Sequence, residues 1–218
     1  MKRADRTGND YALIAVLYPW VDRALHSCRQ SVTEAVQKHN LSRILDMGCG
    51  TGTQVIRLRA AGSAAVGIDI SWPMLRRVGR EVRHAGFFVR GNGCLLPFPA
   101  KVFDGLIYSL SLHEKPHGKR LAMLAEGYRV LKPGGTVFVL DYACPTHGSA
   151  RMFMNLLNMV ECMAGRNHYK AFRDFMKRGA TQALLEAAGL RILSCTFHFH
   201  GTIGLYEGRW ESQHPLPF

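Results

Sequence analysis

The first patterned segment of the chain carries apolar residues three and four positions apart. These residues are Val21, Leu25, Cys28, Val32 and Val36, and the pattern stops at His39-Asn40. Such spacing places the side chains on one face of a helix. The pattern therefore predicts an amphipathic helix that ends near residue 39.

Short apolar runs then alternate with helical patterns. The expected strands are 43–48, 64–69, 87–90, 105–110 and 136–140, and the expected helices are 53–61, 71–86 and 119–130. Ser71 is the expected cap of the second of these helices, with Pro73 in its first turn. Strands separated by helices at this spacing predict a parallel sheet covered by helices on both faces. The fold class indicated is α/β.

After Asp141 the pattern changes. Residues 146–178 are rich in methionine and aromatic residues and look helical, with no strand among them. A short helix over 181–188 follows, and then two β-like runs over 191–198 and 202–207. Because only the region of Gly201 separates the two runs, we expect an antiparallel hairpin. The predicted sheet is thus doubly wound, seven-stranded and mostly parallel.

Composition supports one globular domain. The chain has 218 residues, of which 47% are hydrophobic and 20% charged, so disordered and collagen-like classes are excluded. The apolar run Tyr11–Val21 is about half of the ~20 residues that a membrane-spanning helix needs. Acidic residues flank this run and no cleavage site for a signal peptide follows it. We expect a cytoplasmic protein.

Cysteine spacing and net charge narrow the chemistry. The six cysteines include no C-x-x-C pair, so the sequence indicates no metal site and no disulfide framework, and we expect reduced thiols. Lys and Arg exceed Asp and Glu by 28 to 16, which gives a net charge of +12. This charge favours an acidic partner, which could be nucleic acid, an anionic membrane surface or an anionic cofactor.

A glycine-rich loop is the strongest motif. The sequence Asp46-Met-Gly-Cys-Gly-Thr-Gly52 lies between a predicted strand and a predicted helix, where glycines let a ligand approach the backbone. Asp69 ends the next strand, where its carboxylate can accept hydrogen bonds from ribose hydroxyls. The acid at position 46 would repel a pyrophosphate and would suit an ammonium group. Of the two ligand classes that fit, dinucleotides and S-adenosylmethionine, the loop favours the second.

These residues resemble the class I S-adenosylmethionine-dependent methyltransferases. The matching segments are Ile44-Leu-Asp-Met-Gly-Cys-Gly-Thr-Gly52, Gly67-Ile-Asp-Ile-Ser71, Leu96-Pro-Phe-Pro99, Phe103-Asp104 and Leu131-Lys-Pro-Gly-Gly135. Within that superfamily the chain is most similar to the ubiquinone and menaquinone C-methyltransferase group. That narrower resemblance rests on Asp10-Tyr11, on Leu96-Pro-Phe-Pro99 and on Gly201-Thr-Ile-Gly204.

The resemblance implies S-adenosylmethionine as cofactor. Asp46 would reach its ammonium group, Asp69 its ribose, and Ile70 its adenine. The cofactor-binding residues so implied are Tyr11, Asp46, Gly48, Cys49, Gly50, Asp69, Ile70, Asn92, Gly93 and Ser109. Two positions depart from the family pattern: Asn92 stands where an acid usually accepts the adenine amino group, and Ala12 stands where the quinone group commonly has Asp.

Two residues are candidates for catalysis. His113 follows the fourth predicted strand, at the edge where ligands bind in such sheets, and could act as a base. The alternative for His113 is a loop histidine bonded to nearby backbone. Tyr169, beside His168, could orient an acceptor or could only contribute to packing. The methionines and phenylalanines of 146–178 form either a pocket wall or ordinary packing.

The expected function is methyl transfer to a small, apolar or aromatic, quinone-like acceptor, which includes lipidic ones. The alternative is an RNA or DNA methyltransferase that uses the basic surface, although no base-reading motif is visible. We expect only weak, nonspecific association with nucleic acid or with an anionic membrane surface. The expected organisation is a single methyltransferase domain over 1–218. Its parts are an N-terminal helical cap (1–40), a cofactor-binding core (41–145), a helical lid insertion (146–178), and a C-terminal helix with a β-hairpin (179–218).

Overall fold

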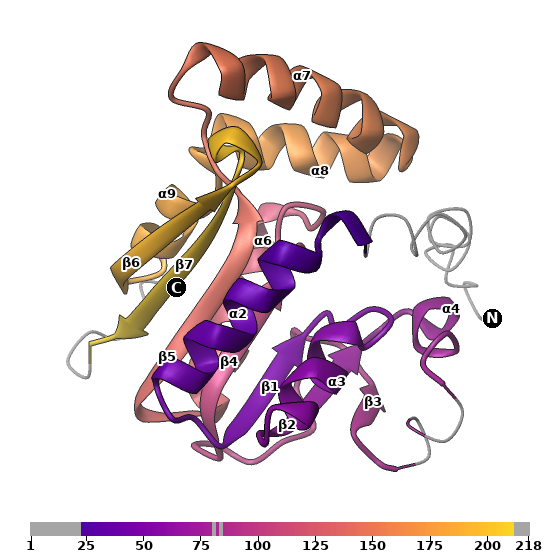
Figure 1. Ribbon diagram of the computed structural model, residues 1–218, viewed down its shortest axis with the longest axis vertical. Coiled ribbons are helices and arrows are strands. Elements are labelled where there is room, and N and C mark those ends of the chain that lie inside the picture. Colours follow the sequence, from indigo (N-terminus) through magenta and orange to yellow (C-terminus); the bar gives the residue numbers. More distant parts are fainter. Residues whose placement is uncertain (1–22, 80–81, 83–84, 212–218) are drawn as a thin grey trace.

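A seven-stranded sheet in the order β3-β2-β1-β4-β5-β7-β6 organises the chain. The computed structural model describes residues 23–79, 82 and 85–211 (Figure 1). The strands are β1 (Arg43–Met47), β2 (Ala64–Asp69), β3 (Phe88–Arg90), β4 (Phe103–Ser109), β5 (Leu131–Tyr142), β6 (Leu190–His198) and β7 (Ile203–Trp210). Strands β1 to β5 pair in parallel, and β7 runs antiparallel to both β5 and β6. The predicted mostly parallel sheet with a C-terminal hairpin is confirmed.

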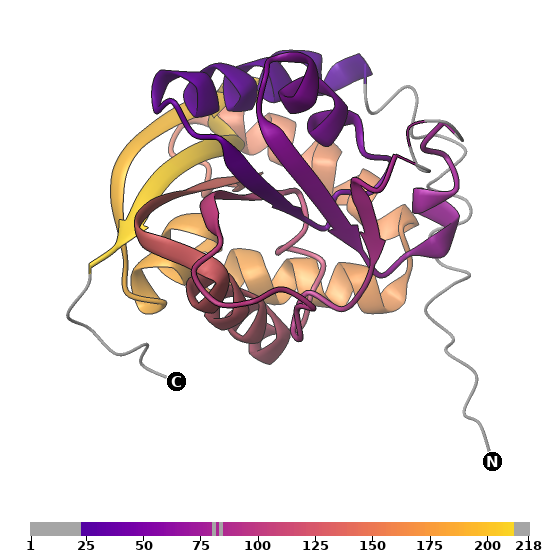
Figure 2. The same cartoon turned by 90° about the horizontal axis from the view of Figure 1, so that it is seen from below.

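Helices cover both faces of this sheet. They are α2 (His26–Lys38), α3 (Thr53–Ala60), α4 (Trp72–Leu75), α6 (His117–Val130), α7 (Gly148–Met163), α8 (Arg166–Lys177) and α9 (Ala180–Ala187), with a short 3-10 turn η2 (Phe199–Gly201). Helices α2 and α3 lie on one face and α6 and α9 on the other, as the two views together show (Figures 1 and 2). None of the helices in the described part of the chain is long and apolar enough to cross a bilayer.

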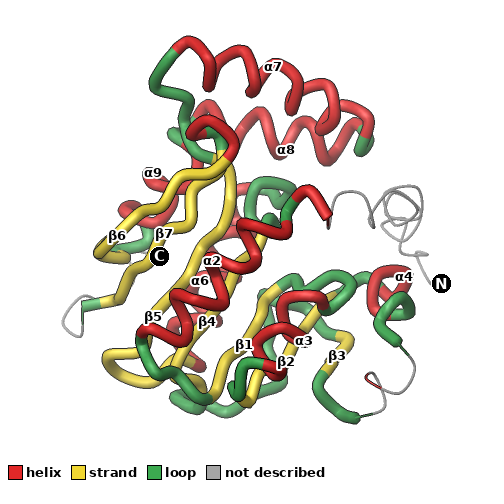
Figure 3. The backbone as a smooth tube through the Cα atoms, viewed as in Figure 1, coloured by secondary structure: helices red, strands yellow, loops and turns green. Residues whose placement is uncertain are grey.

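Helices α7 and α8 form a separate layer at one end of the sheet. They occupy most of the segment 146–178 and lie across the end toward which β5 leads (Figure 3). Parallel strands bring their carboxyl ends to one edge, so the loops after β1, β2 and β4 share that edge with the two helices. The predicted helical segment without a strand is confirmed, and it takes the form of a helix pair.

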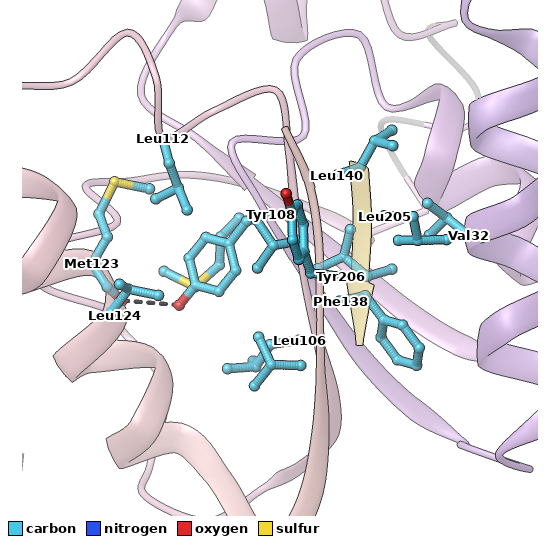
Figure 4. Close-up of a cluster of buried hydrophobic side chains, with 14 of the residues drawn as sticks. Val32, Leu106, Tyr108, Leu112, Met123, Leu124, Phe138, Leu140, Leu205 and Tyr206 are labelled. Atoms are coloured by element: carbon cyan, nitrogen blue, oxygen red, sulfur yellow. Dashed lines mark hydrogen bonds between the residues drawn. The ribbon is translucent and has the colours of Figure 1, made fainter. Parts of the chain in front are cut away.

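The core lies between β4, β5 and the helices on either side. Leu106, Tyr108, Phe138 and Leu140 are fully buried, and Figure 4 shows Tyr108 directed toward α6. The hydroxyl of Tyr108 donates a hydrogen bond to the carbonyl of Met123 at 3.0 Å, which satisfies a buried polar group. This contact fixes α6 against β4 on its face of the sheet.

Two elements differ from the sequence prediction. Helix α4 ends at Leu75, whereas the pattern predicted a helix that continues toward residue 86. Its end is marked by bonds from Arg77 N–H to Met74 and from Val78 N–H to Leu75, which tighten the backbone into three-residue turns. Ser71 precedes α4, but its side chain makes no capping hydrogen bond.

Strand β5 begins earlier than predicted. It starts at Leu131, which pairs with Phe103, so the sequence Leu131-Lys-Pro-Gly-Gly135 belongs to the strand and does not only precede it. The register shifts between Phe103 and Gly105, and Gly134 has φ +75°. A glycine accommodates this irregularity without steric cost.

Candidate functional site

The loop from Gly48 to Gly52 joins β1 to α3 at the carboxyl edge of the sheet. Gly48, Gly50 and Gly52 have φ of +83°, +56° and +76°, a region that residues with a Cβ atom rarely adopt. A Cβ atom on Gly48 would lie 2.7 Å from the Cβ of Ser111, which follows β4. The backbone of the loop therefore packs closely against the segment that leads to His113.

Asp69 holds the glycine loop and the start of α4 together. Gly50 N–H donates to Asp69 Oδ2 at 2.8 Å, and Ser71 N–H donates to Oδ1 at 2.7 Å. Burial raises the pKa of this carboxyl, and the two backbone hydrogen bonds oppose that rise. Each carboxylate oxygen retains a second lone pair that can accept a hydroxyl hydrogen. Such a geometry fits a ribose with two hydroxyls.

Asp46 is a buried acid with an unused oxygen. Its side chain is 1% exposed, and its Oδ1 has no hydrogen-bond partner among the described residues. Burial raises the pKa of Asp46 to about 7, against the opposing charge of Arg29 and with the help of Asp69. A buried carboxylate without a partner is costly unless a ligand satisfies it. Asp46 therefore fits a ligand that brings an ammonium group to the glycine loop.

Two further predicted cofactor residues lie on this side of the sheet. Ile70 is 49% exposed directly after Asp69, as expected of a side chain that covers a flat ring. Asn92 sits in a tight turn, where its amide oxygen accepts a hydrogen bond from Cys94 N–H at 3.0 Å. Only the second lone pair of that oxygen is left for a ligand.

For the remaining predicted cofactor-binding residues, no side chain is seen to face the proposed ligand among the described residues. The thiol of Cys49 points to the position where Gly67 would carry a Cβ atom, so its side chain faces β2 and its backbone forms the loop. Gly93 lies against the side chain of Met123, and Ser109 is the last residue of β4. Tyr11 lies outside the described residues.

A second polar group surrounds His113 at the same edge. His113 is 5% exposed, and its Nδ1 lies 2.7 Å from Asp141 Oδ1. The other oxygen of Asp141 accepts hydrogen bonds from the backbone N–H groups of Leu112 and His113. Asp141 therefore fixes both the ring and the backbone of His113.

Helices α7 and α8 complete this group. Glu161 of α7 has its Oε2 3.7 Å from His113 Nε2, and the same oxygen contacts His168 Nε2 of α8 directly. The hydroxyl of Tyr142 donates to Glu161 Oε1 at 2.6 Å. We call the residues His113, Asp141, Glu161 and His168 the histidine cluster.

Opposite charges in the histidine cluster shift its pKa values. Burial lowers the pKa of His113, but the carboxylates of Asp141 and Glu161 outweigh burial and raise it to about 9. Burial raises the pKa of Glu161, but the charge of His113 and hydrogen bonds from His168 and Tyr142 lower it to about 2. At neutral pH the His113 ring is therefore protonated on both nitrogens and positively charged, between two carboxylates. It is not poised to accept another proton.

Arg120 ties this group to α6 and α8. Its guanidinium is fully buried and donates to the carbonyls of Leu112 and Ala171 and to the carboxylate of Asp174. An arginine fork with several acceptors has a well-defined geometry. The segment that carries His113 is consequently held in place from α6.

Tyr169 lies at the margin of the histidine cluster. Its ring stacks on Phe172 with centroids 6.3 Å apart, and its hydroxyl accepts a long contact from Arg173 at 3.5 Å. Phe172 in turn contacts the ring of His113. Tyr169 thus reaches His113 through Phe172.

An open cavity of about 580 Å³ lies between α7, α8 and the segment after β5. Its lining consists of Cys144, Pro145, Met154, Asn158, Arg173, Asp174, Met176 and Lys177. Met159, in contrast, is 67% exposed and does not line it.

Sequence reasoning missed three members of this polar group. Asp141 ends an apolar strand as Asp69 does, and this parallel was the available signal. Glu161 is an acid in a mostly apolar helix, which also marks it. Tyr142 gave no signal, since a tyrosine at a strand end is common in a core.

Comparison with known proteins places these features in a family. Residues 44–135 match a family model described as a methyltransferase domain. The chain is 37% identical over 173 residues to the demethylmenaquinone methyltransferase of Streptomyces griseus subsp. griseus, covering 74% of each. It is 34% identical over 180 residues to that of Thermus thermophilus, covering 75% of this chain and 80% of the relative. A further match, from Renibacterium salmoninarum, is 37% identical and covers 64% of this chain and 58% of that relative.

Solved structures share the fold at low sequence identity. The PH0226 protein of Pyrococcus horikoshii OT3 superposes with a TM-score of 0.61 at 17% identity, covering 89% of this chain and 91% of that one. The magnesium protoporphyrin IX methyltransferase of Synechocystis PCC 6803 gives 0.58 at 17% identity, covering 85% and 83%. These two matches show that the chain shares its fold with solved structures. The chain belongs to the family of S-adenosylmethionine-dependent methyltransferases that includes the demethylmenaquinone methyltransferases.

Proposed function

We propose that this methyltransferase acts on a small, aromatic acceptor of the quinol type. The observation that carries the proposal is the similarity, over three quarters of the chain, to relatives named for demethylmenaquinone. A quinol becomes a good nucleophile when a hydroxyl loses its proton, because the negative charge spreads to oxygen and ring carbon. The acceptor side of the site should therefore favour an oxygen anion.

The cofactor side uses the loop and its two acids. S-adenosylmethionine supplies a methyl group on a sulfonium centre whose leaving group is already activated. In our proposal Asp46 binds its ammonium group, Asp69 binds its ribose hydroxyls, and Ile70 covers its adenine. The backbone of Gly48 and Gly50 lies alongside. These residues orient the methyl group toward the edge that the histidine cluster shares.

The histidine cluster is the proposed acceptor side. His113 carries its proton at neutral pH, so its role in our proposal is to stabilise a developing oxygen anion by its positive charge. The new bond to the methyl group forms as the sulfur–methyl bond breaks, and the acceptor loses one proton. Burial under α7 and α8 excludes water from this position and strengthens the electrostatic effect.

Residues 146–178 form the proposed lid that selects the acceptor. In the same proposal, residues 1–40 form an N-terminal cap, residues 41–145 the cofactor-binding core, and residues 179–218 the C-terminal part. The cavity between α7, α8 and the segment after β5 supports this role, since Met154 lines it and a methionine side chain adapts to varied apolar shapes. Tyr169 belongs to α8, and its hydroxyl is the proposed orienting group.

Nothing in the comparisons favours the nucleic-acid alternative. The net charge of +12 remains compatible with weak association with nucleic acid or with anionic membranes. Charge alone selects neither of these partners, because Lys and Arg attract any polyanion in the same way.

The test is methyl transfer from labelled S-adenosylmethionine to a panel of quinols, simple phenols and polar amines. We expect quinols to be the best acceptors. Met154→Ala and Tyr169→Phe should lower turnover or acceptor affinity, while cofactor affinity stays within about threefold of the parent because distant sites act independently. Tyr128→Phe, an exposed tyrosine of α6, is the matched control. A preference for polar amines, or unchanged kinetics in both lid variants, would contradict the proposal.

A further inference from the structure

The arrangement of His113, Glu161 and His168 assigns a further site. We propose that these three side chains bind one divalent transition-metal ion of the zinc class. One donor atom from each residue lies within 4.8 Å of the other two, and no other group of three such ligands occurs among the described residues. The ligands would be His113 Nε2, Glu161 Oε2 and His168 Nε2.

Donor spacing fits a tetrahedral ion after a small adjustment. Zinc ligands lie about 2.0–2.2 Å from the metal, which places neighbouring donors about 3.3 Å apart. His113 Nε2 and Glu161 Oε2 are 3.7 Å apart, close to that spacing. His168 Nε2 and the same oxygen are in direct contact, so an ion between them would separate them by a side-chain rotation.

The far side of each proposed ligand also faces a polar group. Asp141 Oδ1 lies 2.7 Å from His113 Nδ1, and the hydroxyl of Tyr142 lies 2.6 Å from Glu161 Oε1. Glu114 Oε2 lies 3.6 Å from His168 Nδ1. Metal-binding histidines characteristically present their second nitrogen to a carboxylate, which fixes the ring and the tautomer. An ion-pair network alone would not require a separate polar partner behind each of three ligands.

The donor set indicates the metal class. Two imidazoles and one carboxylate are typical of zinc sites that keep a fourth position open for water. His113 and Glu161 are buried and His168 is half-buried, so the ion would be largely shielded from solvent. The predicted lack of a metal site rested on cysteine spacing and on the absence of an adjacent histidine pair. This cluster contains no cysteine, and its two histidines lie far apart in the sequence.

The three ligands come from three different elements. His113 follows β4, Glu161 lies near the end of α7, and His168 lies near the start of α8. A bound ion would thus join both lid helices to the carboxyl edge of the sheet. Because an ion that binds only the folded chain stabilises it, zinc should raise the melting temperature.

The experiment uses the full chain after treatment with a chelator and dialysis, in the presence of a non-thiol reductant. Zinc is titrated by calorimetry and counted by mass spectrometry of the metal. We expect one zinc ion per chain and a higher melting temperature. Glu161→Gln and His168→Gln should each weaken binding by at least about tenfold. His39→Gln, which removes a histidine bonded to Glu207 at 2.8 Å elsewhere, should bind zinc as the parent does.

Cobalt distinguishes this site from adventitious binding by thiols. Cobalt bound by nitrogen and oxygen should give visible bands of a tetrahedral ion without the ultraviolet charge-transfer band of a thiolate. That thiolate band would overturn the assignment. So would a parent chain that retains no zinc, or equal zinc affinity in the parent and in folded Glu161 and His168 variants. Circular dichroism without metal verifies that the variants fold, and the measurements on the parent decide the case if they do not.

Zinc binding is measured without any acceptor. The metal assignment can therefore fail while methyl transfer to quinols succeeds, and the reverse outcome would refute only the proposed acceptor. Zinc on His113 Nε2 and the second proton of that ring are alternative states of one site, so the acceptor assays use the metal-free chain.

Discussion

Asp46 is the residue whose protonation should control cofactor binding. Its pKa of about 7 in the unliganded chain means that it is protonated below that pH. The ammonium group of the cofactor, with an ordinary pKa near ~8, favours the carboxylate form. Affinity for S-adenosylmethionine should therefore rise as pH increases through about 7, and it should stop rising as the ligand loses its own charge. The same raised pKa makes this group destabilise the unliganded fold as pH rises.

Calorimetric titrations across this pH range measure the effect. Asp46→Asn should bind more weakly and should lose the rise near pH 7, while circular dichroism shows the fold unchanged. If the parent bound equally well on both sides of that pH, or if the Asn variant kept the same dependence, Asp46 would not contact the ammonium group.

At the scale of elements, the contact between α6 and β4 depends on one glycine. A Cβ atom on Gly127 would lie 2.1 Å from the Tyr108 hydroxyl and 3.0 Å from Leu106. Alanine is about 1 kcal/mol better than glycine inside a helix. Displacing a buried tyrosine that already bonds Met123 should outweigh this gain, since overpacking costs about 1–3 kcal/mol. Gly127→Ala should therefore lower the free energy of unfolding.

Gly118 of the same helix provides the matched control. Apart from its chain neighbours and the backbone of its own helix, a Cβ atom at this position would have no atom within 4 Å. Gly118→Ala should therefore leave stability unchanged or raise it by up to about 1 kcal/mol. Urea unfolding followed by circular dichroism compares the two variants. A Gly127→Ala protein as stable as Gly118→Ala would show that α6 does not pack on Tyr108 as described.

Most elements followed from the periodicity of the sequence. Strand β2 and the hairpin of β6 and β7 were predicted because local sequence patterns indicate their conformation. The start of β5 was not predicted correctly, because its pairing of Leu131 with Phe103 is a tertiary contact. Neither the β-propensity of a segment nor the position of its glycines predicts such a contact. The early end of α4 was not predicted either.

The glycine loop with its two acids could be predicted from the sequence, whereas the histidine cluster could not. Asp46, Asp69 and the glycine loop lie within 24 positions of one another, and the order of strand and helix sufficed to place them. The histidine cluster spans residues 113 to 168 and is assembled by elements that meet only in the folded chain. His113 and His168 could be noticed as polar residues, but their contact through Glu161 could not be derived from spacing.

For the whole molecule, the sheet brings the cofactor residues and the histidine cluster to one edge. The ends of β1 and β2 and the loops that follow them supply the first. The segment after β4 and the end of β5 meet α7 and α8 to form the second (Figure 1). The parallel arrangement makes this possible, because the carboxyl ends of β1 to β5 point the same way. In our proposal, methyl transfer to any acceptor depends on cofactor binding at this edge.

Calorimetric binding of S-adenosylmethionine to Asp69→Ala tests that dependence most directly. Losing charge-assisted hydrogen bonds worth about 1.5–3 kcal/mol each should weaken binding by at least about tenfold. Asp104→Ala is the control, since Asp104 lies at the start of β4, at the opposite edge, where it pairs with Lys132. We expect the control to bind as the parent does and Asp69→Ala to bind at least about tenfold more weakly. An Asp69→Ala protein that folds and binds the cofactor with parental affinity would contradict a cofactor site built on the glycine loop and Asp69.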